Sequence, residues 1–127
     1  MAMDDLKKNG MMAHLLDGLE HKKDIGHYGR LVFTIVGRHF VTEDELVKEL
    51  AKDKDFDAAQ AKSLVQQVAE HDYSPPGRAK ILEYMGKQDF PILPHADDPD
   101  EGNVYRDLEF PQQVYDHIEE YRQHKAE

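Results

Sequence analysis

The longest apolar pattern in the chain lies in residues 24–40, DIGHYGRLVFTIVGRHF. Its apolar side chains recur three and four residues apart, which is the spacing of one face of an α-helix. This face consists of Tyr28, Leu31, Val32, Ile35 and Val36, and Phe33 and Phe40 extend it around most of the circumference. The β-branched residues would also suit a strand, but no second strand with turn residues lies nearby, and an isolated strand is not stable. We therefore expect a central, largely buried helix.

Two further helices are expected over residues 43–52 and 58–71. Thr42 and the glutamate three residues later form a capping box, and Asp57 with Gln60 repeats this arrangement at the second helix. The aspartates of the intervening DKDFD end the first helix, because negative charge near a helix C-terminus opposes the macrodipole. The expected buried stripes are Leu46, Val47, Leu50 and Ala51 in the first helix and Ala61, Leu64, Val65 and Val68 in the second.

The N-terminal segment carries a weaker helical pattern. Apolar residues between positions 4 and 23 follow helical spacing, but Gly10 and Gly18 each weaken a helix by up to about 1 kcal/mol relative to alanine. We therefore expect residues 1–24 to form a frayed or partner-dependent helix.

The C-terminal third is divided by prolines. Ser74 is predicted to cap a further helix with Pro75 at its first position, where the missing N–H costs nothing. The inward residues of that helix would be Ile81, Leu82 and Met85. Four prolines follow between residues 89 and 111, so an extended, acidic loop is expected over 89–110. A last helix is expected over 111–124, with Val114, Ile118 and Tyr121 packing inward.

Together these elements predict an all-α protein with a single domain over residues 1–127. We expect a small orthogonal bundle of five to six helices, with a helix-turn-helix-like corner and a long Pro-rich acidic loop before the C-terminal helix. No apolar run approaches the roughly 18 residues of a membrane span, and the N-terminus lacks the apolar segment of a secretory signal. The absence of cysteine excludes disulfides and is typical of a reducing compartment. These features predict a soluble, cytoplasmic protein.

Charge is unevenly distributed along the chain. Sixteen basic against 26 acidic side chains give a net charge of −10. Residues 1–41 carry six basic and five acidic groups, whereas residues 42–127 carry ten basic and twenty-one acidic groups, a net charge of −11. Such a field repels phosphate backbones and favours basic protein partners or cations, although an acidic balance also serves solubility alone.

A helix-turn-helix DNA reader is one alternative, with 43–52 and 58–71 as its two helices. The outward face of the second helix would present Gln60, Lys62, Ser63, Gln66 and Gln67 to base edges. However, residues 42–73 contain four lysines and nine acids, so they lack the positive charge that phosphate contacts require. The connection also lacks the glycine often found in such turns. A helical corner with a polar outer face is the simpler interpretation.

No metal or cofactor is expected. DKDFDAAQAKSL and DPDEGNVYRDLE each match part of a calcium loop, but Ala58 replaces the required glycine in the first, and Gly102 comes one place early in the second. Two histidine pairs are spaced seven residues apart, His14 with His21 and His117 with His124. Metal-binding histidine pairs on one helix normally lie about four residues apart, so these pairs are not expected to bind a metal.

Candidate chemistry is sparse, because the chain has no nucleophile elbow, no P-loop and no dinucleotide fingerprint. The most suggestive pattern is Arg30, Thr34 and Arg38, which line up at i, i+4 and i+8 on the central helix. This stripe either is the exposed edge of the helix or binds carboxylates, from the 97–109 loop or from a partner. Arginine suits the second role because its planar guanidinium donates two parallel hydrogen bonds to a carboxylate.

These patterns favour a protein–protein interaction domain, a small regulatory adaptor without catalytic activity whose partner is another, basic protein. The predicted partner-binding residues are Arg30, Arg38, Phe90, Ile92, Leu93, Tyr105 and Phe110. The apolar members would supply affinity, and the surrounding acids would steer the approach. The DNA-binding regulator and a small enzyme with carboxylate or histidine chemistry stay open as alternatives. The oligomeric state is also open, a homodimer included.

Overall fold

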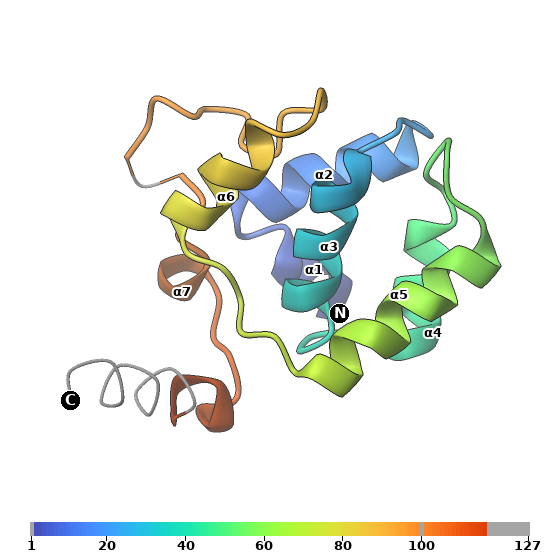
Figure 1. Cartoon of the computed structure of the whole chain (residues 1–127). Helices are drawn as coiled ribbons and strands as arrows, with labels where there is room; N and C mark the ends of the chain where they lie inside the picture. Colours follow the sequence, from blue (N-terminus) through green and yellow to red (C-terminus); the bar gives the residue numbers. More distant parts are fainter. Residues whose placement is uncertain (1, 100, 117–127) are drawn as a thin grey trace.

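The computed structural model of this chain describes residues 2–99 and 101–116, and in this part the protein is all-helical, without a strand (Figure 1). The helices are α1 (Ala2–Leu6), α2 (Gly10–Glu20), α3 (Gly26–Gly37), α4 (Glu43–Leu50), α5 (Ala58–His71), α6 (Arg78–Met85) and α7 (Val104–Asp107). A last helical stretch is described over residues 112–116. The all-α, single-domain prediction is confirmed. The described part holds more helices than the five to six expected, because two short ones, α1 and α7, were not foreseen.

Helix α3 is the central element, as its apolar pattern predicts. It packs against α2, α4, α5 and α6, with α4 and α5 on one side of it and α6 on the other (Figure 1). Val32, Phe33 and Val36 are fully buried. The domain is therefore built around a helix that is apolar on most of its circumference, which is the arrangement expected for a core helix.

Both predicted capping boxes are present. Thr42 Oγ1 accepts a hydrogen bond from the amide of Glu45 at 3.2 Å, and Asp57 Oδ1 accepts one from the amide of Gln60 at 2.8 Å. The connection between α4 and α5 runs from residue 51 to residue 57. It is longer than the three- to four-residue turn of a DNA-binding helix-turn-helix. The capping boxes thus define where α4 and α5 begin, but the connection between these helices is longer than the turn of a DNA-binding helix-turn-helix.

A buried ion pair ties this corner to α3. Arg30 Nη1 lies 3.2 Å from Asp53 Oδ2, which also accepts a hydrogen bond from the amide of Ile25 at 3.0 Å. Asp24 lies 3.1 Å from the same guanidinium, and the ring of Phe56 stacks under it at 4.4 Å. The acidic corner therefore has a structural role in this fold, since its first aspartate neutralises a buried arginine.

The N-terminal segment differs from the single frayed helix expected over 1–24. It forms two helices, because Asn9 interrupts the pattern and caps α2 by accepting a hydrogen bond from the amide of Met12 at 3.0 Å. Gly10 thus lies at a helix start, where its flexibility costs little. Gly18 is closely packed, because a Cβ there would lie 2.9 Å from Ile25 Cγ2. The segment belongs to the core through Leu6, Met11, Met12, Leu15, Leu16 and Leu19.

The start of α6 corrects the cap predicted at Ser74. The helix begins at Arg78, its N-cap is Gly77, and no side chain caps it. The physical reason is the Pro75–Pro76 pair, because a proline disfavours the helical conformation of the residue before it. Ile81 is buried as expected, whereas Leu82 and Met85 are partly buried against the core.

The segment over 89–110 is packed onto its own domain. Ile92, Leu93 and Phe110, three of the predicted partner anchors, are almost completely buried. Phe90 and Tyr105 are partly buried against the same core. All five residues therefore contribute to the core of this fold, and the three buried ones are covered by the protein itself, whereas Phe90 and Tyr105 keep part of their surface exposed. A segment of the same chain packs onto the core without the loss of translational and rotational freedom that association with a partner costs. This difference favours packing within the chain over binding to a partner.

The helix predicted over 111–124 is described only in its first turns. Val114 is buried, as expected, whereas Ile118 and Tyr121 lie outside the described residues. No helix in the part of the chain that the structure covers is long and apolar enough to cross a membrane.

Candidate functional site

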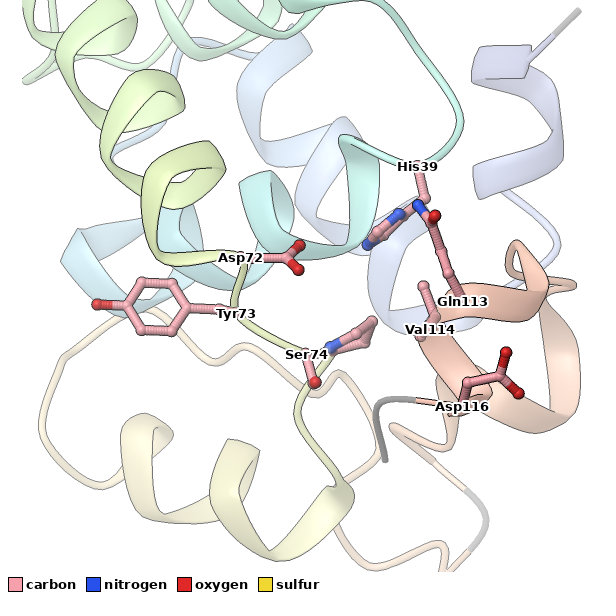
Figure 2. A pocket seen from close by; sticks show the side chains of 8 residues that line it. His39, Asp72, Tyr73, Ser74, Gln113, Val114 and Asp116 are labelled. Carbon is pink, nitrogen blue, oxygen red and sulfur yellow. The ribbon is translucent and has the colours of Figure 1, made fainter. Parts of the chain in front are cut away.

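A pocket of about 320 Å³ lies between the segment after α3, the α5–α6 linker and the last described turn (Figure 2). Its lining residues are His39, Asp72, Tyr73, Ser74, Pro75, Gln113, Val114 and Asp116. Three segments that are far apart in sequence thus supply an imidazole, two carboxylates, a hydroxyl and an amide to one hollow. This chemical variety makes it the candidate functional site.

His39 is the most unusual group in the pocket. Its ring packs edge-on against Phe110, with 5.6 Å between ring centroids. The Nε2 atom is buried and has no hydrogen-bond partner among the described residues. Burial lowers the pKa of His39 below its usual value, and the positive charge of Arg38 lowers this pKa further, against an opposing effect of Asp72. The lowered pKa favours the neutral imidazole at pH 7.

Asp72 is positioned by the end of α5. It is the C-cap residue, with φ of 49° in the left-handed region, a conformation that aspartate tolerates better than most residues. Its carboxylate lies 2.8 Å from Arg38 Nη1, an ion pair that offsets an acid at the negative end of a helix. In Figure 2 the Asp72 carboxylate and the His39 imidazole point toward each other.

Tyr73 forms an exposed edge of the site. It is 39% exposed, the one large hydrophobic side chain that is exposed in the described part of the chain. Its ring stacks on His71 at 5.2 Å between centroids and points away from the pocket interior (Figure 2). Gln113 extends toward His39 from the opposite wall, and Asp116 lies at the outer edge. The pocket thus combines a polar interior with an aromatic rim.

The pocket lies where the two most acidic stretches of the sequence meet. Residues 42–73, which contribute Asp72 and Tyr73, carry four basic and nine acidic groups, a net charge of −5. Residues 89–99 and 101–116, which contribute Gln113 and Asp116, carry one basic and seven acidic groups, a net charge of −6. Field lines concentrate in hollows with low-dielectric walls, so a cation approaching this region is attracted.

The two arginines of the predicted stripe have different environments. Arg30 is buried and paired with Asp24 and Asp53, which removes it from any partner surface. Arg38 is 22% exposed at the edge of the pocket and is paired with Asp72. The hypothesis that this stripe binds the 97–109 loop is therefore wrong for the described residues, since the contacting carboxylates come from elsewhere in the chain.

The acidic loop instead packs against the start of α2. Asn9 Nδ2 donates a hydrogen bond to Asp107 Oδ2 at 3.0 Å. The Glu101 carboxylate oxygens lie 3.6 Å from the position that a Cβ on Gly10 would occupy. Helix N-termini carry partial positive charge and attract carboxylates, which accounts for this placement.

The residues proposed for DNA reading share one exposed face of α5: Gln60, Lys62, Ser63, Gln66 and Gln67. This surface is polar, as predicted for a solvated face. Neither it nor the calcium-loop segments gather ligands for a metal, because no cluster of three or more histidine or carboxylate side chains suited to a metal ion occurs among the described residues. In the first of those segments Asp53 pairs with Arg30 and Asp57 caps α5.

Most of the pocket could not be predicted from the sequence. Of its lining residues, the sequence patterns singled out Ser74 and Pro75 as helix caps and Val114 as a packing residue, but none as a site. Three comparisons, with protein-family models, with curated proteins and with solved structures, found no match to this chain. The function therefore has to be argued from the geometry and charge of the pocket itself.

Proposed function

We propose that this domain is a small cytoplasmic adaptor or regulatory domain that binds a basic segment of another protein, with the pocket accepting a cationic side chain. The observation that carries this proposal is the position of the pocket between residues 42–73 and the described residues of 89–116, which carry net charges of −5 and −6. A negative field of this kind raises the rate at which a basic segment encounters the site.

The lining groups suit a cation. Asp116 offers a carboxylate, and Ser74 and Gln113 offer neutral oxygen acceptors. The lowered pKa of His39 favours its neutral form, so this ring adds no positive charge to the wall at pH 7. The charged group of a lysine or arginine side chain has hydrogen-bond donors and no acceptor, so a pocket wall lined with acceptors complements it. Asp72 contributes charge to the wall while its pairing with Arg38 holds it in place.

The dimensions suit one side chain. At about 320 Å³ the pocket is at the lower end of the range of ligand sites, roughly 300–1,000 Å³. Exposed ion pairs contribute only about 0–1 kcal/mol each, so Asp116 alone gives little affinity. Tyr73 at the rim adds the apolar contact area that tyrosine commonly supplies at interfaces.

The small-enzyme alternative has one supporting observation. A neutral imidazole at His39 with the Asp72 carboxylate and the Ser74 hydroxyl in the same pocket is a set that could support general-base chemistry. However, His39 Nε2 has no hydrogen-bond partner among the described residues, so this atom does not form the required base–nucleophile contact. Binding is therefore the function that the geometry supports best.

A peptide titration tests the proposal. A short lysine- and arginine-rich peptide should bind the protein in calorimetry or fluorescence anisotropy, and its affinity should fall as salt is added. Asp116→Asn and Tyr73→Ala should each weaken this binding.

Asp55→Asn is the matched control, because it removes the same charge from an exposed position at the opposite end of α5. Equal losses in the Asp55 and Asp116 variants would show that net charge, not the pocket, attracts the peptide. Absence of binding to any basic peptide would refute the function itself.

A further inference from the structure

Beyond this pocket, α3 and α6 together present a ladder of two lysines and two tyrosines. The rings of Tyr28 and Tyr84 stack with 4.8 Å between centroids and 16° between their planes. Lys80 Nζ lies over the ring of Tyr84, 5.6 Å from its centroid, and Lys87 Nζ lies over the ring of Tyr28, 5.8 Å from its centroid. In this lysine–tyrosine ladder the two lysines are exposed, whereas the two tyrosines are partly buried against the core.

The ladder presents hydrogen-bond donors. The lysine side chains are 55% and 52% exposed, and each ammonium group has three donors. Neither tyrosine hydroxyl has a hydrogen-bond partner in the part of the chain that the structure describes. A surface of ammonium and phenol groups complements ionised carboxylates, because these accept hydrogen bonds and have none to donate.

Glu83 shows that these lysines are spaced to share carboxylates. Its two oxygens lie 3.5 Å from Lys80 Nζ and 3.6 Å from Lys87 Nζ. All three side chains are more than half exposed, so these contacts contribute little to stability and exchange readily for others. Carboxylates from outside the chain can therefore take the place of Glu83 at little cost.

The local charge has the opposite sign to that of the whole protein. Residues 74–88 carry three basic groups and one acidic group, a net charge of +2, within a chain of net charge −10. The segments on either side of this stretch, 42–73 and 89–127, are both strongly acidic. The positive charge on α6 is therefore a distinct local feature, separate from the acidic pocket.

The ladder is also held rigid. Gln88 Oε1 accepts hydrogen bonds from the amides of Tyr28 and Gly29 at 2.8 and 3.2 Å, and its Nε2 donates to the carbonyl of Ile25 at 2.9 Å. This side chain fixes the end of α6 to the start of α3, so both tyrosines keep their relative position. Binding to a preorganised surface avoids part of the ordering cost of association.

We propose that the lysine–tyrosine ladder is a second binding surface, which takes a carboxylate-rich segment of a partner protein. Such a segment supplies acceptors for the ammonium and hydroxyl groups in one extended contact. With the pocket for basic segments, the domain would bind partners of opposite charge on separate surfaces, which goes beyond the function proposed above.

Single-stranded nucleic acid fits the ladder less well. Recognition of single strands depends on bases stacking on open aromatic faces and on many phosphate contacts. Here the two rings stack on each other, and each also has a lysine ammonium group over it. Two lysines also neutralise few phosphates, and the net charge of −10 repels a long polyanion.

The experiment compares a short peptide rich in glutamate and aspartate with the same peptide carrying glutamine and asparagine, by fluorescence anisotropy on the full chain. The acidic peptide should bind and its amide counterpart should not. The double variant Lys80→Gln, Lys87→Gln should weaken binding about tenfold, as expected for two lost charge contacts. Tyr84→Phe, which keeps the stack and removes one donor, should weaken it by a smaller factor.

The matched control is Lys54→Gln, Lys62→Gln, which removes two exposed lysines from the α4–α5 region and should leave binding unchanged. Circular dichroism checks that every variant is folded. Equal loss in the two double variants, equal binding of the amide peptide, or tighter binding of a single-stranded oligonucleotide would each overturn the proposal. Asp116→Asn should leave this binding intact, so failure of the ladder is distinguishable from failure of the pocket.

Discussion

At the residue scale, two arginines eight positions apart on one helix illustrate how burial decides what a charge does. Arg30 is buried with Asp53, whose side chain is fully inaccessible, whereas Arg38 pairs with a carboxylate that is 68% exposed. Removing one partner of a buried pair leaves an uncompensated charge, which is far more costly than losing an exposed pair. Two arginines on the same helix therefore have different roles: Arg30 has a structural role in the core, and Arg38 has a role at the surface.

Replacing each arginine by methionine tests this difference. Arg30→Met should lower the free energy of unfolding by about 3–5 kcal/mol, because Asp53 stays buried without its partner. Arg38→Met should lower it by about 0–1 kcal/mol. Methionine keeps much of the apolar stem in both cases, so packing loss is small. Denaturant unfolding of the two variants provides the measurement, and similar losses would contradict the assignment of Arg30 to the core.

A second prediction at this scale concerns His39 and pH. The folded protein holds the pKa of His39 below its usual value, chiefly through burial and then through Arg38, so the unfolded chain binds the proton more readily. The stability that neutral His39 contributes is therefore fully present above the pKa of the unfolded chain, about 6.5. This stability is lost as pH falls through the lower pKa of the folded protein.

Chemical denaturation between pH 7 and pH 5 should accordingly show wild-type stability falling toward the acid side. His39→Phe keeps a ring against Phe110 and removes the titration, so its stability should depend less on pH in this interval. The charged neighbours Arg38 and Asp72 are present in both proteins and do not account for a difference between them. Identical pH dependence in the two proteins would exclude His39 as the titrating group.

At the element scale, the helix starts separate what sequence can predict from what it cannot. The capping boxes at Thr42 and Asp57 involve residues three positions apart, so they were predictable and are present. Helix α3 has no side-chain cap of its own. The amide of Gly26 donates to the nearby Asp24, but the amides of Tyr28 and Gly29 donate to Gln88, about sixty positions along the chain. A partner at that separation is fixed by tertiary packing, which leaves no local pattern in the sequence.

The same reasoning explains why the central helix was predicted and the pocket was not. The apolar spacing of α3 involves only residues close together in the sequence, so it predicts this helix whatever the arrangement of the other helices. The pocket joins His39, Asp72 and Gln113, and their proximity depends on how three connections are placed in space. The predicted anchors of segment 89–110 were recognised as apolar contacts, but the sequence could not tell that their own core would take them.

A substitution of Gln88 tests how much its hydrogen bonds to the backbone contribute to stability. Gln88→Leu removes an amide that bonds to the backbone at Ile25, Tyr28, Gly29 and Phe90. Partly buried backbone groups left without partners cost about 1–3 kcal/mol, so the variant should unfold at clearly lower denaturant concentration. Gln67→Leu is the control, because that glutamine is exposed on α5. Equal stability of both variants would show that water replaces the amide without loss.

At the scale of the whole molecule, charge is arranged by region. The acidic residues 42–73 and the described part of the acidic C-terminal segment, up to residue 116, contribute to the pocket, and the basic segment 74–88 carries the lysines of the ladder. This arrangement gives the protein two surfaces of opposite sign, although its net charge is −10. Long-range attraction depends on the sign of the local field, so a single net charge does not describe which partners each surface favours.

Duplex DNA provides the last prediction, because it responds to the field of the whole molecule. Non-specific affinity for DNA comes from neutralised phosphates, and the exposed face of α5 offers one lysine, Lys62, within a segment of net charge −5. The long α4–α5 connection also departs from the turn that places a recognition helix in the major groove. We therefore expect no measurable duplex binding in a gel-shift or anisotropy titration, even at roughly 50 mM salt, where phosphate contacts are strong. A clear shift at micromolar protein that Lys62→Ala abolishes would instead support the DNA-binding regulator. The same shift with Lys62→Ala unaffected but Lys80→Gln, Lys87→Gln deficient would assign the affinity to the ladder.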